Sequence, residues 1–379
     1  MEAMDDTVRG VSHHEDRSEP RLPVEGLDRL IGSLRWAHLR LVLRAEEALS
    51  LPAYAGSTFR GAFGHAFKRV ACPLRRQCEG CAHRAVCVYV YVFETEGPGE
   101  GSSLARGRTV AHPFVLEPPE TPAREIPAGA TLELGLVLIG RAISLAPYFL
   151  AACRDMAREG LGRGRGRCRL ERVLAEDPES PAGRVVYDGA ADLLAPAVPV
   201  WSAAELAGQD GMRNAVCGMR SGERGARNGG ARNGGGAEGR GGEGGGGERV
   251  TLEFVTPTRL RQDADLVVKP EFATLATALL RRLSVLAETH CGHQGAIQAR
   301  ELLSGAADVT VATSDLRWHD WERYSARQGT RMTLGGFLGR ITFAGPLEPW
   351  WRLLRLGEVL HVGKGTAFGL GKYRMVSEG

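Results

Sequence analysis

The stretch GFLGRITFAGPLEPWWRLLRLGEVLHVGKGTAFGLGKYRMV, residues 336–376, decides the predicted fold. Residues 336–343 form a short run that predicts a strand, and residues 349–360 predict a helix. A glycine-rich segment follows the helix, and residues 370–376 predict a final strand. A strand, a helix and a strand in this order form the second half of a βαββαβ unit.

The residues upstream of this stretch supply the first half of the same unit. Residues 250–256 are β-branched and alternating, which predicts a strand, and residues 309–318 predict another. Between them, residues 270–289 carry apolar side chains at helical spacing: Phe272, Leu275, Leu279, Leu283 and Leu286. The predicted order is that of the ferredoxin-like unit, which RNA-recognition domains use with a four-stranded sheet as platform.

The first half of the chain repeats this order less cleanly. Strands are predicted at residues 34–44, 113–116, 132–139 and 168–173, with helices at 58–70 and 146–158. The predicted fold class is therefore α+β, with two tandem ferredoxin-like (RRM-like) domains. A cysteine-rich loop is inserted after the first helix of the N-terminal domain.

A glycine-rich run at residues 218–247 marks the boundary between the two halves. Glycine removes side-chain packing and increases backbone entropy, so we expect a flexible linker. Its arginines could contact RNA non-specifically, or the run could be a solvated spacer. We predict a disordered N-terminus at 1–30, an N-terminal domain at 31–205, the linker at 206–249 and a C-terminal domain at 250–379.

Composition limits the functional classes. The chain has 379 residues, of which 43% are hydrophobic and 25% charged, with a net charge of +3. This balance is only mildly basic, so local clusters must carry any argument for a nucleic-acid partner. The N-terminus has no secretory signal, and no run of about 18 apolar residues exists. We therefore expect no transmembrane helix and no membrane partner, and a cytoplasmic location.

The segment HVGKGTAFGLGKYR, residues 361–374, carries the first functional signal. Glycines let backbone N–H groups approach phosphate closely, and lysines neutralise its charge. A nucleotide-binding loop would precede its helix, whereas this segment follows one, which disfavours that interpretation. A plain glycine-rich hairpin stays open. The predicted RNA-backbone contacts are Gly363, Lys364, Gly365, Gly369, Gly371 and Lys372.

This segment resembles the C-terminal glycine-rich loop of the RAMP superfamily of CRISPR-associated proteins. Further motifs agree in order: RGAFGHAFKR (60–69), VTPTRL (255–260), RRL (281–283), RYSARQ (323–328) and LGGFLGRITFAG (334–345). With the cysteine cluster, they resemble the CRISPR endoribonucleases that process precursor RNA at its repeats. The resemblance implies tandem ferredoxin-like domains, repeat RNA as partner, and metal-independent cleavage that yields guide RNAs for antiviral defence. The alternative is a non-catalytic RAMP subunit that binds CRISPR RNA together with other effector proteins.

RNA cleavage without metal needs a base, an acid and cations. The predicted helix at 58–70 presents an apolar face and a polar face, and His65 and Lys68 are neighbours on the polar one. Tyr54 lies just upstream. The resemblance implies catalytic roles for His65, Lys68 and Tyr54, whereas the alternative is a solvated basic face. His361, directly before the glycine-rich segment, is a rival catalytic residue or a packed histidine at a helix end.

Other basic residues are candidates for RNA contact. Arg163 and Arg165 alternate with glycine and could follow a phosphate backbone or only protect a sheet edge. The remaining candidates are Arg60, Arg69, Arg259, Arg323 and Arg327.

Four cysteines cluster at Cys72, Cys78, Cys81 and Cys87. The inner C-x-x-C pair presents two thiolates to one ion, and four thiolates close a tetrahedral site. We expect a structural zinc ion here, with an iron–sulfur cluster or free, redox-sensitive cysteines as alternatives. No cofactor is expected for catalysis.

Overall fold

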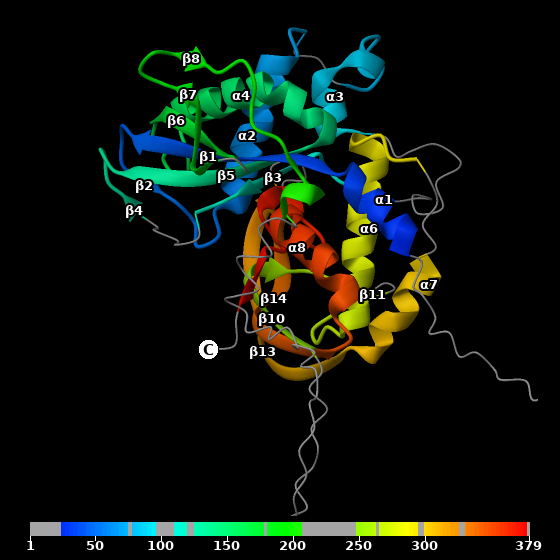
Figure 1. Cartoon of the computed structure of the whole chain (residues 1–379). Helices are drawn as coiled ribbons and strands as arrows, with labels where there is room; N and C mark the ends of the chain where they lie inside the picture. The colour runs from blue at the N-terminus through cyan, green and yellow to red at the C-terminus, as the bar shows by residue number, and fades with distance from the viewer. Residues whose placement is uncertain are drawn as a thin grey trace, which may run out of the picture.

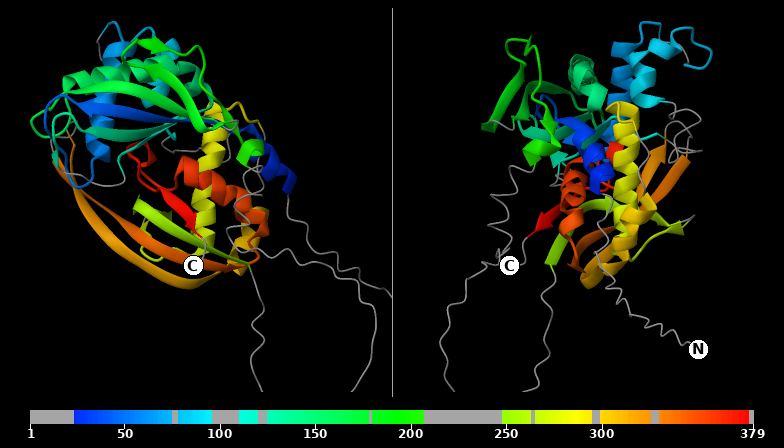
Figure 2. Two further views of the ribbon diagram at one scale, coloured as in Figure 1. Left: turned by 60° about the vertical axis from the view of Figure 1, so that its left-hand side comes forward. Right: turned by 45° about the vertical axis from the view of Figure 1, so that its right-hand side comes forward.

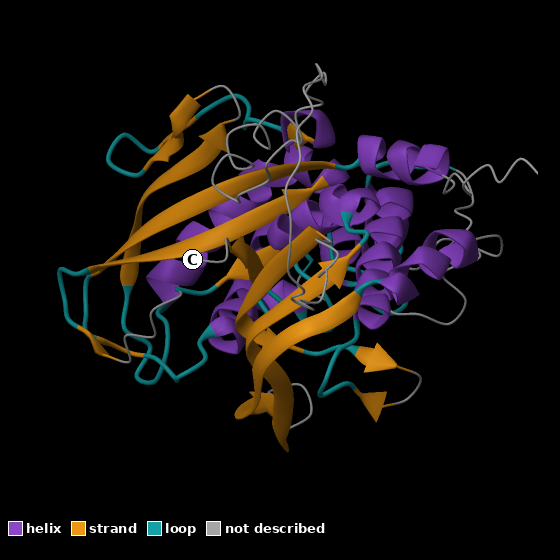
Figure 3. Cartoon of the chain, turned by 60° about the horizontal axis from the view of Figure 1, so that its bottom comes forward, coloured by secondary structure: helices purple, strands orange, loops and turns teal. Residues whose placement is uncertain are grey.

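The computed structural model describes residues 24–74, 78–95, 110–119, 125–177, 180–206, 248–262, 265–294, 299–325 and 330–376. These residues form a mixed α+β protein with two bodies, each built on an antiparallel sheet (Figure 1). Figure 3 shows the strands of the two sheets as separate groups. Among the described residues, no helix combines the length and apolar character needed to cross a membrane.

The N-terminal body follows the predicted order of elements. Its main elements are β1 (Arg35–Ala45), α2 (Gly56–Ala71), β3 (Phe114–Glu117), β5 (Thr131–Ile139), α4 (Ala146–Glu159) and β6 (Cys168–Asp177). The sheet order β3-β5-β1-β6 places the first strand between the third and the fourth, and β7 (Ser180–Asp188) extends the sheet beyond β6. This order is consistent with a ferredoxin-like unit.

The C-terminal body has the same arrangement. Its main elements are β10 (Glu248–Thr258), α6 (Phe272–His290), β13 (Thr310–Ser325), β14 (Thr330–Gly345), α8 (Trp351–Leu360) and β15 (Tyr373–Val376). The strand order is β13-β14-β10-β15, which is the order of the four main strands of the N-terminal sheet. Each predicted strand and helix of this half is present, although β13 and β14 form a longer hairpin than the alternation predicted.

The shorter elements connect or flank these two sheets. They are α1 (Val24–Ser33), β2 (Leu49–Ser50), η1 (Arg84–Val86), α3 (Val88–Phe93), β4 (Glu125–Ile126), η2 (Gly140–Leu145), β8 (Leu193–Leu194), β9 (Trp201–Ser202), β11 (Arg261–Gln262), β12 (Asp265–Leu266), α7 (Ala299–Ser304), η3 (Gly305–Asp308), η4 (Glu348–Trp350) and η5 (Thr366–Phe368). Helix α1 corrects the expectation of disorder over 1–30, because it begins at Val24 and buries Leu27 and Leu30. The proposed linker lies almost entirely outside the described residues, so the domain boundaries stay a prediction.

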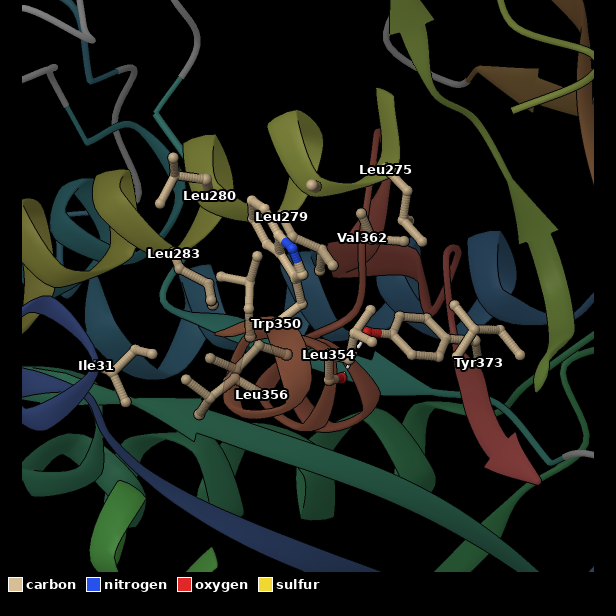
Figure 4. Close-up of a cluster of buried hydrophobic side chains, with 14 of the residues drawn as sticks. Ile31, Leu275, Leu279, Leu280, Leu283, Trp350, Leu354, Leu356, Val362 and Tyr373 are labelled. Atoms are coloured by element: carbon tan, nitrogen blue, oxygen red, sulfur yellow. Dashed lines mark hydrogen bonds between the residues drawn. The ribbon is translucent and has the colours of Figure 1, made fainter. Parts of the chain in front are cut away.

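Two hydrophobic cores stabilise the fold. Alternate residues of β1 (Leu39, Leu41 and Leu43) point into the N-terminal core with α2 and α4, because successive strand side chains face opposite sides. The C-terminal core gathers residues from α6, α8 and β15, as Figure 4 shows around Trp350 and Leu279. There the hydroxyl of Tyr373 donates a hydrogen bond of 2.6 Å to the carbonyl of Leu354, which satisfies a polar group inside an apolar core.

The long β13–β14 hairpin of the C-terminal body also contacts the N-terminal body. It rises from the C-terminal sheet toward the N-terminal body, as the left view of Figure 2 shows. Trp321 of β13 packs its ring 4.7 Å from the ring of Tyr54, which precedes α2. Side chains of both bodies, including Tyr54, His38, Lys372 and His319, line a cavity of about 740 Å³ next to this contact.

Candidate nucleic-acid interface

The glycine-rich loop, residues 361–372, follows α8 and turns back on itself. Its four glycines, Gly363, Gly365, Gly369 and Gly371, all have positive φ, between 76° and 82°. Side chains are excluded for a second reason, because an added Cβ would lie within 3.0 Å of a neighbouring atom at all four positions. A Cβ on Gly371 would lie 1.8 Å from the carbonyl oxygen of Val362, and one on Gly369 would lie 2.4 Å from Cδ of Pro118. The glycines therefore serve the packing of the loop itself.

The motif at residues 255–260 fastens the loop to the end of β10. The amide of Lys364 donates to the carbonyl of Arg259 at 3.0 Å, and the amide of Gly371 donates to that of Pro257 at 3.2 Å. The hydroxyl of Thr256 donates to the carbonyl of Gly369 at 2.8 Å and accepts from the amide of Lys372 at 2.9 Å. Two motifs that are far apart in the sequence are therefore one structural unit.

Only the first part of the loop offers a free surface. Lys364 is exposed and Gly363 and Gly365 are half-buried, whereas Gly369 and Gly371 are buried. The predicted RNA contacts of Gly369 and Gly371 therefore give way to a packing role. Lys372 is turned inward, where its ammonium lies 3.1 Å from Oε1 of Glu117. Lys364 is the loop cation that faces solvent.

The second part of the loop docks on the N-terminal body at the start of α2. The hydroxyl of Tyr54 donates to the carbonyl of Phe368 at 2.7 Å, and burial raises the pKa of this hydroxyl. Gly56, in the first turn of α2, leaves room for the same carbonyl, since a Cβ there would lie 2.1 Å from it. The guanidinium of Arg60 lies over the rings of Phe93 and Phe368, at 4.4 and 5.7 Å.

A charged cluster lies beneath this contact. The carboxylate of Glu117, at the end of β3, accepts from Nε2 of His361 at 2.8 Å and from Nε2 of His38 at 3.0 Å. His38 also contacts Glu176 through Nδ1 at 3.0 Å. Because an ionised carboxylate only accepts hydrogen bonds, His38 makes both of its bonds only as an imidazolium ring. The other nitrogen of His361 lies 3.1 Å from the carbonyl of Leu370.

Burial and the neighbouring charged groups shift the pKa values of this cluster in opposite directions. Burial alone would lower the pKa of His38, but the hydrogen bonds and charges of Glu117 and Glu176 raise it to about 10. Burial likewise opposes ionisation of Glu117, yet hydrogen bonds from His361 and His38 hold the pKa of this carboxyl well below its ordinary value. At His361 burial outweighs the carboxylate and lowers the pKa of the ring. His38 is therefore charged at neutral pH and pairs with both Glu117 and Glu176.

The predicted catalytic residues fall into two groups. His65 is exposed on α2 and lies nine residues after Gly56, the first residue of this helix. That spacing corresponds to roughly 13 Å along the helix axis. Lys68 lies one turn further, with its ammonium 5.1 Å over the ring of Tyr89. Neither residue lines the cavity between the bodies. Tyr54 and His361 hold the glycine-rich loop instead, and His361 is completely buried.

The other predicted RNA contacts are scattered. Arg163 and Arg165 are exposed in the turn after α4, where Arg165 pairs with Glu159 at 3.1 Å. Arg69 pairs with Asp155 at 2.7 Å. Arg259 is half-buried. Its pKa is lowered mainly by burial and to a smaller extent by the positive charge of Arg261.

The RYSARQ motif contributes little that can be placed. Arg323 belongs to β13, but its side chain lies outside the described residues, as does all of Arg327. Their predicted RNA contacts therefore stay predictions.

The cysteine segment does not form the predicted metal site. Cys72, Cys78, Cys81 and Cys87 are all half-buried free thiols. Over the described part of the chain, no group of three or more His, Cys, Asp or Glu side chains could hold an ion. A closed zinc site needs four converging ligands, so these residues as arranged do not fit one.

Cys78 is instead surrounded by ordinary side-chain contacts. Burial and a hydrogen bond with Glu94 raise the pKa of its thiol. The same carboxylate pairs with Arg84 at 2.9 Å. Glu94 therefore contacts both Cys78 and Arg84.

Sequence reasoning missed His38, Glu117 and Glu176. They stand on three different strands, and nothing in their local sequence indicates that they meet. One signal was present: Gly135 interrupts the apolar strand β5, and it lies directly opposite Glu117 in the strand register. A glycine inside a strand often marks a close approach of another group.

The paired antiparallel sheets and the glycine-rich loop between them define a protein with the RAMP fold. Residues 252–373 match the family model of the CRISPR-associated endoribonuclease Cas6, and residues 34–198 match a model described as an N-terminal domain. The C-terminal body therefore belongs to the Cas6 family of CRISPR-associated endoribonucleases.

Solved structures share the fold at low identity. The product complex of Thermus thermophilus Cas6 is 19% identical, with a TM-score of 0.50 over 90% of this chain and 99% of that one. A partial Cas6-RT-Cas1–Cas2 complex is 12% identical, with a TM-score of 0.52 over 91% of this chain and 46% of that one. No curated protein sequence matches the chain.

Proposed function

We propose that the chain binds precursor CRISPR RNA and cuts it within its repeats without a metal ion, so that mature guide RNAs are released for antiviral defence. Membership of the Cas6 family supports the substrate and the reaction. A relative is part of a complex of Cas6-RT-Cas1 with Cas2. By analogy we propose that other CRISPR proteins are partners of this chain.

One structural relationship carries the proposal: the glycine-rich loop of the C-terminal body docks on the start of the histidine-bearing helix of the N-terminal body. The bond from Tyr54 to Phe368 and the close approach of Gly56 fix this junction. The loop that carries the exposed Lys364 consequently contacts the helix that carries the exposed His65. RNA held at Lys364 would continue onto the face that carries His65.

The proposed reaction uses the 2′-hydroxyl of the RNA as nucleophile. A base removes its proton, the 2′-oxygen forms a bond to phosphorus, and the bond to the 5′-oxygen breaks. An acid protonates the departing 5′-oxygen, which leaves a 2′,3′-cyclic phosphate and a 5′-hydroxyl. We assign proton transfer to His65, since imidazole exchanges protons near neutral pH. Lys68 supplies positive charge for the pentavalent phosphorus.

The decisive assay incubates the full chain with end-labelled repeat RNA in EDTA. The proposal predicts one cut with a cyclic phosphate end, abolished by a 2′-deoxy substitution at the cut site. Tight binding with intact RNA would favour the non-catalytic RAMP subunit. Cleavage that EDTA abolishes and added Mg²⁺ restores would overturn the metal-independent mechanism.

A further inference from the structure

We propose that Glu117 is a positioning residue of this nuclease: its carboxylate closes the glycine-rich loop and holds it in the conformation that receives RNA. The inference rests on the proposed function for its effect on RNA. Its structural half, the closure of the loop, stands independently of that function.

Glu117 contacts the loop at both ends. His361 is the first residue of the loop and Lys372 the last. Nε2 of His361 donates to Oε1 of Glu117 at 2.8 Å, and the ammonium of Lys372 forms an ion pair with the same oxygen at 3.1 Å. The whole loop is thus closed by one carboxylate that belongs to the other body. The ring of His361 also lies against the loop itself, since its Nδ1 is 3.1 Å from the carbonyl of Leu370. Removing the carboxylate would leave a buried imidazole and an ammonium without their shared partner.

The N-terminal sheet is built to hold this carboxylate. Glu117 of β3 lies opposite Gly135 of β5. A Cβ at Gly135 would lie 2.2 Å from Oε2 and 2.9 Å from Cβ of Glu117. Any other residue at position 135 would therefore displace the side chain of Glu117. The glycine inside an otherwise apolar strand is explained by the space that the carboxylate needs.

The remaining charges of the cluster fix the orientation of Glu117. His38 of β1 donates to Oε2 at 3.0 Å, and Glu176 of β6 binds the opposite side of the same ring at 3.0 Å. The groups that face Glu117 are thus His38 and, through it, Glu176 from the N-terminal sheet, and His361 and Lys372 from the loop. The two carboxylate oxygens have separate roles, because Oε2 anchors to the sheet and Oε1 holds the loop.

This arrangement assigns different roles to the two loop lysines. Lys372 is engaged by Glu117 and acts inside the protein, whereas Lys364 is exposed and can meet phosphate. Lys364→Met should therefore weaken RNA binding and lower its salt dependence, with amide exchange in the loop unchanged. Lys372→Met should speed amide exchange in the loop.

The test compares Glu117→Ala, Glu117→Gln and Gly135→Ala with the control Glu133→Gln, in full-length protein. Glu133 is an exposed residue of β5, the strand that also carries Gly135. It forms only a long ion pair with Arg40, at 3.7 Å. Amide hydrogen exchange is followed by mass spectrometry in peptides covering residues 361–372 and, as internal reference, residues 272–290. Repeat-RNA affinity and single-turnover cleavage are measured in parallel.

We expect amide exchange in residues 361–372 to accelerate by about tenfold or more in Glu117→Ala and Gly135→Ala, with RNA affinity reduced by a similar factor. The reference peptide and Glu133→Gln should match wild type. If Glu117→Ala does not fold, Glu117→Gln carries the test, since it keeps the size and loses the charge. Loop exchange unchanged in a folded Glu117 variant would overturn the inference. Failure of wild-type protein to bind or cut repeat RNA would instead overturn the proposed function, and the exchange result would still stand.

Discussion

The hydroxyl of Tyr54 donates a hydrogen bond of 2.7 Å to the carbonyl oxygen of Phe368, across 314 residues of sequence and the junction of the two bodies. Tyr54 precedes α2, and Phe368 belongs to the glycine-rich loop. The contact couples the helix with the proposed catalytic histidine to the loop that we propose receives RNA. We therefore propose that Tyr54 positions the glycine-rich loop.

Tyr54→Phe should reduce the free energy of unfolding by about 1 kcal/mol, because Phe368 loses its donor while the ring contact with Trp321 persists. Chemical denaturation measures this loss. RNA affinity should fall more than the cleavage rate at saturating enzyme. A large loss of that rate with normal affinity would show instead that Tyr54 acts on the scissile phosphate.

Gly371→Ala should destabilise the protein by about 1–3 kcal/mol. The position has φ of 76°, and a Cβ would meet the carbonyl of Val362 at 1.8 Å. The matched control is Gly26→Ala in helix α1, where nothing lies within 4 Å of the added Cβ. The control should be neutral or stabilising, because alanine favours helix more than glycine does. Equal stability of the two variants in urea titration would argue against the packing role of Gly371.

The His38 pair should make stability depend on alkaline pH. The pKa of His38 rises from 6.5 to about 10 on folding, so the folded state binds the proton of this ring more strongly. The resulting stabilisation is complete below pH 6.5 and is lost as pH rises through about 10. Denaturant midpoints over this range should fall more steeply for wild type than for His38→Gln. Parallel curves would contradict the ion pairs of His38 with Glu117 and Glu176.

The salt dependence of RNA binding separates a solvent-facing cation from one held in an ion pair. Lys364→Met should reduce the slope of log affinity against log salt by about 1, as expected for one lost phosphate contact. Arg69→Met is the comparison, because Arg69 already pairs with Asp155 at 2.7 Å. It should change the slope less. A larger effect at Arg69 would mean that RNA displaces Asp155 and uses the far end of α2.

Elements with strong periodicity could be predicted from the sequence, and elements without it could not. The apolar spacing of α6 and the alternation of β10 led directly to a helix and a strand. Helix α1 was missed because it follows a polar segment, and its burial depends on contacts with α6, which no local pattern reveals. The length of β13 was also missed, since its distal half is held by the partner strand β14 and by Tyr54.

The candidate site, too, could be predicted from the sequence only in part. The glycine-rich loop was identified from its composition, but the division between exposed Lys364 and inward Lys372 depends on Glu117, a residue of the other body that is distant in the sequence. His361 was weighed as a packed histidine at a helix end, and its complete burial supports that interpretation. The zinc site followed from cysteine spacing, whereas ligation requires convergence in space, which the described residues do not show.

The central claim is that the exposed face of α2 cuts RNA while the glycine-rich loop holds it. The most direct test is the single-turnover cleavage rate of His65→Ala on repeat RNA in EDTA, beside His293→Ala as a control at a histidine outside α2. We expect the cleavage rate of His65→Ala to fall by about a hundredfold or more, with RNA affinity close to wild type and His293→Ala unaffected. A His65→Ala protein that cleaves at the wild-type rate would contradict the account.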